Sequence, residues 1–295
     1  MKVTVWLLCL AILSLVASSE SVAQASTQSD STGLPGDNFS LQGALEMFKR
    51  AASPEDFEKL INTEDNKVNN LDLNGDGEID YVRVIDKTDK GAHAFVLQVP
   101  VSDKENQDIA VIELEKTGDS TAVVQIVGDE EIYGEQTIVE PGEDEEDADE
   151  AEGEDEGKGP ALLSLVSSPP ARIVVNVWGW PSVRFVYAPR YVAWVSPWRW
   201  RVYPAWWRPW RPLAWRVFHP FAFRHRAGFA VVRTHRVLVA HRVYAPHRVT
   251  SVTVRTRHHG AVSRHKVTKT TTIRTKSGAV KVKKSKTTTK VRKRR

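Results

Sequence analysis

Residues 79–127, IDYVRVIDKTDKGAHAFVLQVPVSDKENQDIAVIELEKTGDSTAVVQIV, decide the fold. Apolar and β-branched residues alternate there with polar residues at a period close to two, which is typical of β-strands. Clusters of Asp, Lys, Gly and Ser separate the apolar runs and indicate short turns, so the stretch predicts an antiparallel meander of four strands. The strands are expected at 79–85, 94–101, 109–115 and 121–127.

Two short helices are predicted immediately before this sheet. Ser40 is a suitable N-cap for a helix whose apolar residues recur at helical spacing through Phe48. Ser53 caps a second helix, with Pro54 at its first position and Asp56 completing an acidic capping-box pattern. Helices packed on one face of an antiparallel sheet form a small α+β domain, which we place at residues 38–135.

The beginning of the chain has the features of a secretory signal peptide. Lys2 precedes an apolar run at 5–17, and Ala23-Gln24-Ala25 provides a cleavage motif. The apolar run is shorter than the roughly 20 residues that a membrane-spanning helix needs. We therefore expect residues 1–25 to be removed on export, which places the protein in the periplasm, in the outer envelope or outside the cell.

Charge is divided between the two halves of the chain. All 37 Asp and Glu residues lie at or before Glu156. Residues 26–157 hold 36 acidic and nine basic residues, whereas residues 158–295 hold 31 Lys and Arg and eight of the nine His. This separation predicts either an anionic partner for the basic half or association of the two halves with each other.

Composition divides the rest of the chain into four segments. Residues 26–37 are small and polar, typical of a flexible leader. Residues 136–159 are dominated by acids, and like-charge repulsion predicts a disordered linker. Residues 160–253 contain nine of the ten Trp, interleaved with Arg and Pro, and are expected to form short strands and Pro-rich turns. Residues 254–295 are predicted to be a disordered basic tail.

Motifs of catalysis are missing from the sequence. The single cysteine, Cys9, lies in the predicted signal peptide, so we expect neither a disulfide nor a thiol nucleophile in the exported protein. The sequence contains no GxSxG, HExxH, Walker or GxGxxG motif. His93 is the one histidine of the predicted α+β domain, which is typical of a surface residue. The sequence therefore predicts a protein that is not an enzyme.

The nine residues 72–80, DLNGDGEID, have the spacing of a calcium loop. Side chains that carry oxygen lie at its first, third, fifth and ninth positions, and Gly77 permits a sharp turn that points them inward. Calcium is a hard cation that takes several oxygen ligands, and such a loop can wrap around it. A tight polar turn without metal is the alternative, because Asn-Gly and Asp-Gly are common turn dipeptides.

This loop resembles the DxNxDGxxD loops of EF-hand-like proteins, dockerins and integrin-type FG-GAP repeats. The twelfth position is Arg83 instead of a bidentate Glu, and a strand pattern follows instead of a helix. Both departures favour a structural site of roughly 10⁻⁴–10⁻³ M affinity over a paired sensor. The resemblance implies four side-chain ligands and one backbone carbonyl, from Asp72, Asn74, Asp76, Asp80 and, for the carbonyl, Glu78.

The Trp- and Arg-rich stretch between residues 194 and 211 predicts contact with an anionic partner. Trp favours membrane interfaces and Arg pairs with lipid or lipopolysaccharide phosphates, whereas Trp stacking and Arg together also suit acidic glycans. The same composition suits single-stranded nucleic acid, but export argues against that partner. Alternatively, these Trp residues form the core of a second small β domain. The expected contact residues are Trp194, Trp198, Arg199, Trp200, Arg201, Trp206, Trp207, Arg208, Trp210 and Arg211.

Two functions follow from these features. The first is an exported, non-enzymatic calcium-binding protein that attaches to anionic envelope components through its basic, Trp-rich half. The second is a self-assembling structural or matrix protein whose acidic and basic halves associate between chains. A hydrolase would have to depend on His93. The overall pattern also resembles uncharacterised exported proteins of Gram-negative bacteria, which implies a localisation and no activity.

Overall fold

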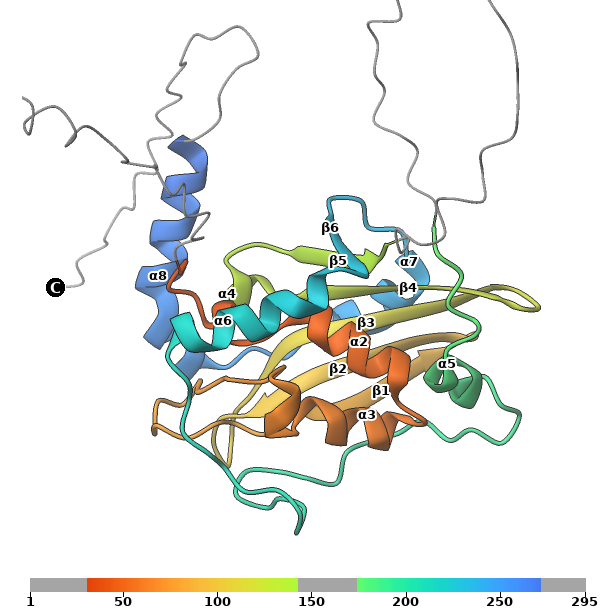
Figure 1. Ribbon diagram of the computed structural model, residues 1–295, viewed down its shortest axis with the longest axis horizontal. Helices are drawn as coiled ribbons and strands as arrows, with labels where there is room; N and C mark the ends of the chain where they lie inside the picture. Colours follow the sequence, from red (N-terminus) through yellow and green to blue (C-terminus); the bar gives the residue numbers. More distant parts are fainter. Residues whose placement is uncertain (1–30, 143–173, 272–295) are drawn as a thin grey trace, which may run out of the picture. The chain divides into compact units, whose positions relative to one another are not determined.

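The computed structural model describes residues 31–142 and 174–271. They form a six-stranded sheet with helices on both faces (Figure 1). Every strand is antiparallel to its neighbours, and the order across the sheet follows the chain. The strands are β1 (Arg83–Asp89), β2 (Ala92–Pro100), β3 (Asn106–Gly118), β4 (Thr121–Gly128), β5 (Thr137–Pro141) and β6 (Phe229–Val232). The α-helices of these residues are α2 (Leu41–Arg50), α3 (Pro54–Ile61), α4 (Glu130–Tyr133), α5 (Pro181–Val186), α6 (Trp215–Phe223), α7 (Leu238–Tyr244) and α8 (Val252–Thr271), joined by the 3-10 turns η1 (Pro35–Asn38), η2 (Glu64–Asn66), η4 (Arg224–Arg226) and η5 (Ala245–His247).

The two predicted helices are confirmed, together with their caps. The Ser40 hydroxyl accepts a hydrogen bond from the backbone N–H of Gly43 at 3.0 Å, at the start of α2. The Ser53 hydroxyl accepts from the N–H of Asp56 at 3.1 Å, at the start of α3. The Asp56 carboxylate in turn accepts from the N–H of Ala52 at 2.9 Å. These contacts satisfy N–H groups that have no partner within the helix.

One face of the sheet and the two helices enclose the main core. Phe48 of α2 lies 5.3 Å from Phe57 of α3 and 5.1 Å from Phe95 of β2, measured between ring centroids. All three rings are fully buried, and each contributes on the order of 2–3 kcal/mol of hydrophobic stabilisation. Val183 of α5, which belongs to the basic half, is buried in the same core.

The opposite face of the sheet is covered by α7. Ala94 and Val96 of β2 lie there in a buried cluster with Tyr244 of α7. Ala92 of β2 packs against Ala240 in a neighbouring cluster. The small Ala side chains of β2 leave room for the helix to approach the strand closely. A segment of the basic half is therefore part of the same folded unit as the sheet.

The predicted fold of two helices on a four-stranded sheet, with a separate basic segment and a disordered tail, is wrong, although the α+β class holds. The predicted linker supplies β5, and the basic segment supplies β6, which pairs with β5 along the register from Ile138 opposite Val232 to Pro141 opposite Phe229. The edge of β4 thus receives two more strands, which cover an edge that would otherwise offer unpaired backbone groups.

Other differences arise at the ends of elements. β1 begins at Arg83 instead of residue 79, because the N–H of Asp80 is hydrogen-bonded to the carbonyl of Leu71. Helix α5 begins at Pro181, where the Pro occupies a first-turn position that needs no N–H. Helix α8 lies in the predicted tail. The predicted signal peptide, most of the predicted linker and the end of the predicted tail lie outside the described residues.

None of the helices in the described ranges combines the length and the hydrophobicity that crossing a membrane requires.

Candidate functional site

The turn at residues 72–77 wraps backbone N–H groups around one carboxylate. Asp72 accepts hydrogen bonds from the N–H groups of Gly75 at 2.6 Å, Asp76 at 3.1 Å and Gly77 at 3.0 Å. Gly75 and Gly77 have φ angles of 74° and 85°, a region that favours glycine. The sequence therefore folds this segment into the compact loop that its spacing predicted.

Asp76 and Asp80 approach each other across this loop. The amide nitrogen of Asn74 donates to an oxygen of Asp76 at 3.0 Å and to an oxygen of Asp80 at 3.0 Å. Asp80 also accepts from the N–H of Leu73 at 2.6 Å. Burial raises the pKa of Asp80 to about 7, and the charges of Asp72 and Asp76 add to the shift.

These residues fit a calcium ion after one rearrangement. A donor group of Asn74 lies between two carboxylates, where a cation would lie, so the amide has to turn for its oxygen to become a ligand. The side chain of Glu78 is exposed, which is consistent with a contribution from its carbonyl alone. Calcium would neutralise the charges of Asp72 and Asp76, which now add to the raised pKa of Asp80.

The basic half flanks the loop at residues 72–80 on two sides. The N–H of Ile79 donates to the carbonyl of Trp210 at 2.8 Å. Arg257 of α8 lies against Gly75, since a Cβ atom added to this glycine would be 1.6 Å from a guanidinium nitrogen. The loop is thereby connected both to the Trp-rich stretch and to α8.

Residues 194–196 of the basic half run antiparallel to β1. The N–H of Asp86 donates to the carbonyl of Trp194 at 2.7 Å, and the N–H of Ser196 donates to the carbonyl of Val84 at 3.0 Å. These are strand-like contacts at the outer edge of the sheet. They hold the backbone in place just before the rest of the Trp- and Arg-rich stretch.

Glu58 of α3 connects the same stretch to the first helix pair. One carboxylate oxygen accepts from the hydroxyls of Tyr81 at 2.8 Å and Ser196 at 2.9 Å. The other accepts from the N–H of Val84 at 2.8 Å and from the indole N–H of Trp194 at 3.2 Å. Burial raises the pKa of Glu58, and the four hydrogen bonds oppose that shift. The indole of Trp194 is therefore hydrogen-bonded within the protein itself.

Further contacts hold residues 198–213. Arg83 donates to the carbonyl of Trp198 at 3.2 Å. Asn70 accepts from the N–H of Leu213 at 2.8 Å and donates to its carbonyl at 2.9 Å. The stretch is thus attached to the α+β core at its first residue and, through Trp210 and Leu213, near its last.

The exposed and half-buried Arg and Trp residues of this stretch form what we term the Arg/Trp surface: Trp198, Arg199, Trp200, Arg201, Trp206, Arg208, Trp210 and Arg211. Its four Arg side chains are exposed, and none forms an ion pair with any residue that the structure describes. Trp206 is 48% exposed, whereas Trp207 is 2% exposed and packs against Tyr81 and Tyr203. Trp207 therefore belongs to the packed interior and is not available to a partner.

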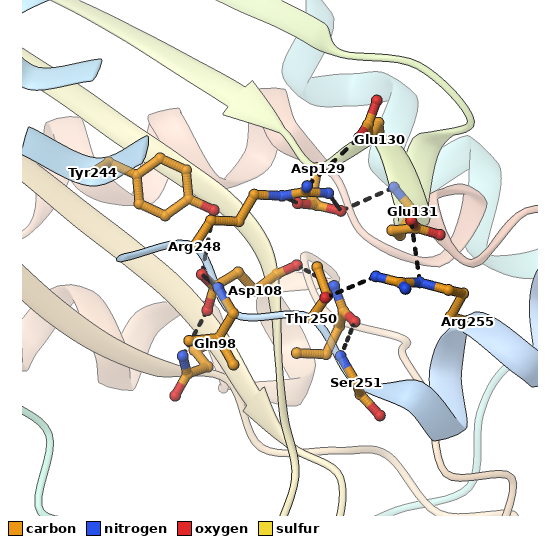
Figure 2. Close-up of polar contacts among 12 residues, drawn as sticks. Gln98, Asp108, Asp129, Glu130, Glu131, Tyr244, Arg248, Thr250, Ser251 and Arg255 are labelled. Atoms are coloured by element: carbon orange, nitrogen blue, oxygen red, sulfur yellow. Dashed lines mark hydrogen bonds and ion pairs between the residues drawn. The ribbon is translucent and has the colours of Figure 1, made fainter. Parts of the chain in front are cut away.

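Other Arg residues of the basic half pair with acids of the same chain (Figure 2). Arg248 contacts both oxygens of Asp129, at 2.5 and 3.0 Å, and lies 3.5 Å from Glu130. Arg255 lies 3.4 Å from Glu131. Burial raises the pKa of Asp129, and Arg248 partly offsets the shift. These pairs attach residues 248–255 to the acidic half.

Asp108, on β3, binds the same segment without a cation. It accepts from the hydroxyl of Tyr244 at 3.2 Å and from the N–H of Val249 at 2.8 Å, while Gln98 donates to its other oxygen at 2.6 Å (Figure 2). Burial raises the pKa of Asp108, again against these hydrogen bonds. The polar side chains on this face of the sheet thus bind the segment that covers them.

His93 is buried, contrary to the expectation of a surface residue. Its ring stacks on Phe95 and contacts Tyr187 and Tyr191, and it is 4% exposed. Its Nδ1 lies 2.9 Å from a carboxylate oxygen of Asp86, which also accepts from the hydroxyl of Tyr191 at 2.7 Å. An imidazole enclosed in this way has a structural role.

The sequence did not predict one group of side chains that could ligate a metal ion: Glu113, His235 and His241. The two His residues lie 122 and 128 positions after Glu113, so no local spacing connects them. A weak signal is Glu113 itself, a charged residue within the apolar strand IAVIELE.

A scan against protein-family models, a search of curated proteins and a search of solved structures find no match to the chain.

Proposed function

We propose that this protein is an exported, non-enzymatic calcium-binding protein that attaches to anionic envelope lipids through the Arg/Trp surface. The observation that carries the proposal is the contrast between two sets of Arg residues. Arg236, Arg248 and Arg255 pair with carboxylates of the chain, whereas the four Arg residues of the surface have no acidic partner among the described residues.

The surface is also fixed in place before any partner arrives. Contacts of Trp198, Trp210 and Leu213 with the core hold its backbone, so binding costs less conformational entropy than binding by a free chain. Each basic residue near an anionic membrane contributes about 1 kcal/mol, and four contribute about 4 kcal/mol. The exposed ring of Trp206 and the half-buried rings of the surface add favourable interfacial contacts, and Arg201 already lies 5.5 Å from the ring centroid of Trp200.

We propose that bound calcium stabilises one end of this surface, at Trp210. The loop holds the carbonyl of Trp210 through the N–H of Ile79. An ion bound by Asp72, Asp76 and Asp80 would order the loop and, through this hydrogen bond, the backbone beside the exposed rings. The role is structural, because the site is followed by a strand and not by a second helix of an opening pair.

The self-assembly alternative loses support from the intrachain pairing. The acidic residues that bind Arg236, Arg248 and Arg255 belong to the same chain, so these Arg residues are not available to a neighbour. Salt-sensitive oligomers of the purified protein without lipid would favour this alternative.

Vesicle sedimentation tests the proposal. The protein is expected to sediment with phosphatidylglycerol vesicles and not with phosphatidylcholine vesicles. Replacing Arg199, Arg201, Arg208 and Arg211 by Gln is expected to weaken binding at least 100-fold. Replacing Arg184, Arg190, Arg216 and Arg233 by Gln removes the same charge from other exposed positions and serves as the matched control. Equal losses in both variants, or binding to an acidic polysaccharide and not to the vesicles, would contradict the proposal.

Calorimetry of the whole protein tests the calcium site. One calcium ion is expected to bind, with Asp76→Asn abolishing the heat and Asn66→Asp, outside the loop, leaving it unchanged. Because Trp210 contacts the loop, calcium is also expected to change tryptophan fluorescence. Absence of binding at millimolar calcium refutes the calcium part alone.

A further inference from the structure

We propose that Glu113, His235 and His241 form a binding site for a divalent transition metal ion of the zinc class, separate from the calcium loop. Nδ1 of His241 lies 2.7 Å from one oxygen of Glu113, and Nε2 of His235 contacts the other. The three ligand atoms all lie within 4.8 Å of one another. Two imidazoles and one carboxylate form the donor set of zinc sites that keep an open coordination position.

The charge of Glu113 is the first argument for a metal. Its side chain is fully buried on β3, and its contacts in the described residues are the two imidazoles. Asp129 and Glu140, two other buried acids of this region, each have an Arg partner. A buried charge is costly unless it is paired or well hydrogen-bonded, and a metal ion held jointly with both imidazoles would pair the charge of Glu113.

Neighbouring side chains hold the two histidines in position. The carboxylate of Glu115 accepts from the N–H groups of Val239 at 2.5 Å and Ala240 at 2.9 Å, just before His241. The side-chain oxygen of Gln125 accepts from the N–H of Arg236 at 2.7 Å, just after His235. Such supporting hydrogen bonds fix ligand orientation in metal sites.

The geometry leaves room for the ion. Ligand atoms around a tetrahedral zinc lie roughly 3.3 Å apart, so the present contacts have to open by less than about 1 Å. The side chains of His235 and His241 are 17% and 31% exposed, so both can move outward. His241 also lines a cavity of about 270 Å³ beside Tyr244 and Arg248, which offers a route for the ion and for water as a fourth ligand.

The nitrogen ligands select the metal class. Imidazole suits zinc, cobalt, nickel and copper, whereas calcium prefers an all-oxygen set. A bound ion would join β3 of the acidic half to α7 and to the segment just before it, both in the basic half. The bound ion would therefore help to hold α7 against the second face of the sheet.

Titration of the purified, metal-free protein with Zn²⁺ and Co²⁺ tests the proposal. We expect one Zn²⁺ ion to bind and to raise the melting temperature, and Co²⁺ to give the visible absorption of a four-coordinate site. His235→Asn, His241→Asn and Glu113→Gln should each weaken binding at least tenfold. His247→Asn, at an exposed position, and Asp76→Asn, in the calcium loop, should leave binding unchanged.

A second measurement covers the case in which a ligand variant fails to fold. Each histidine of the wild-type protein is modified with diethylpyrocarbonate, with and without Zn²⁺, and the products are mapped by mass spectrometry. Protection confined to His235 and His241 supports the site. If no Zn²⁺ binds, or if other histidines are protected instead, the proposal is overturned, and Glu113 only forms hydrogen bonds with the two imidazoles.

Discussion

Replacing Glu58 by Ala is expected to destabilise the fold and to detach the Arg/Trp surface without removing any of its side chains. Glu58 is 2% exposed and accepts four hydrogen bonds, two from hydroxyls and two from N–H groups. The hydroxyls of Tyr81 and Ser196 can turn elsewhere, but the N–H groups of Val84 and Trp194 cannot. Each buried donor without a partner costs about 1–3 kcal/mol, so the expected loss is about 3–5 kcal/mol.

Glu58→Gln is the matched control, because an amide can serve all four partners. Its oxygen can accept from Val84 and Trp194, while its NH₂ group donates to the hydroxyls of Tyr81 and Ser196. We expect denaturant unfolding to show a loss of about 3–5 kcal/mol for Ala and about 1 kcal/mol or less for Gln at pH 7. Vesicle binding should weaken for Ala alone. If the two variants are equally stable, the hydrogen-bond argument is refuted.

Glu58 has a folded-state pKa above its ordinary value of 4.5, so the stability that it contributes is present below pH 4.5 and is lost as the pH rises through the folded-state pKa. Tyr81 and Arg83, which face Glu58, keep their protonation states over this range. The unfolding free energy of Glu58→Gln minus that of the wild type should therefore rise across this range, and a flat difference contradicts the shift. Arg248→Leu leaves Asp129 buried without its cation and should cost about 3–5 kcal/mol in denaturant unfolding, much of it recovered in the double variant with Asp129→Leu. Gly75→Ala combines a φ angle of 74° with a clash against Arg257 and should lower the melting temperature, whereas Ala at Gly179, where no atom lies within 4 Å, should not. Arg257→Ala removes a cation beside the calcium loop and should tighten calcium binding several-fold in calorimetry, while Arg242→Ala, on α7, should change it little.

The elements that the sequence predicted well are those set by local rules. Ser40 and Ser53 cap helices because their hydroxyls reach N–H groups three residues on. The hairpin turns between β1 and β4 join strands that are adjacent in the chain, so composition and period are sufficient to locate them. The turn at residues 72–77 is equally local, because its hydrogen bonds span at most five positions.

The elements that the sequence did not predict depend on distant contacts. β6 pairs with β5 across about 90 residues of chain, and four short apolar residues, FAVV, carry no signal of that partner. Glu113, Gln125 and Gln98 alternate with apolar residues, a pattern that ordinarily indicates a face in water. The face is covered instead: Glu113 and Gln125 bind the covering segment directly, and Gln98 donates to Asp108, which binds that segment.

The division of charge therefore has a structural consequence beside the binding function that we propose. Arg236 and Arg248 pair with Glu140 and Asp129, whose carboxylates are almost fully buried, so salt screens these pairs less than it screens exposed charges. The exposed Arg residues of the Arg/Trp surface are open to screening. Raising the salt concentration should consequently release the protein from anionic vesicles well before it lowers the melting temperature. One set of Arg residues then stabilises the fold, and the other set is the one that we propose binds anionic lipid.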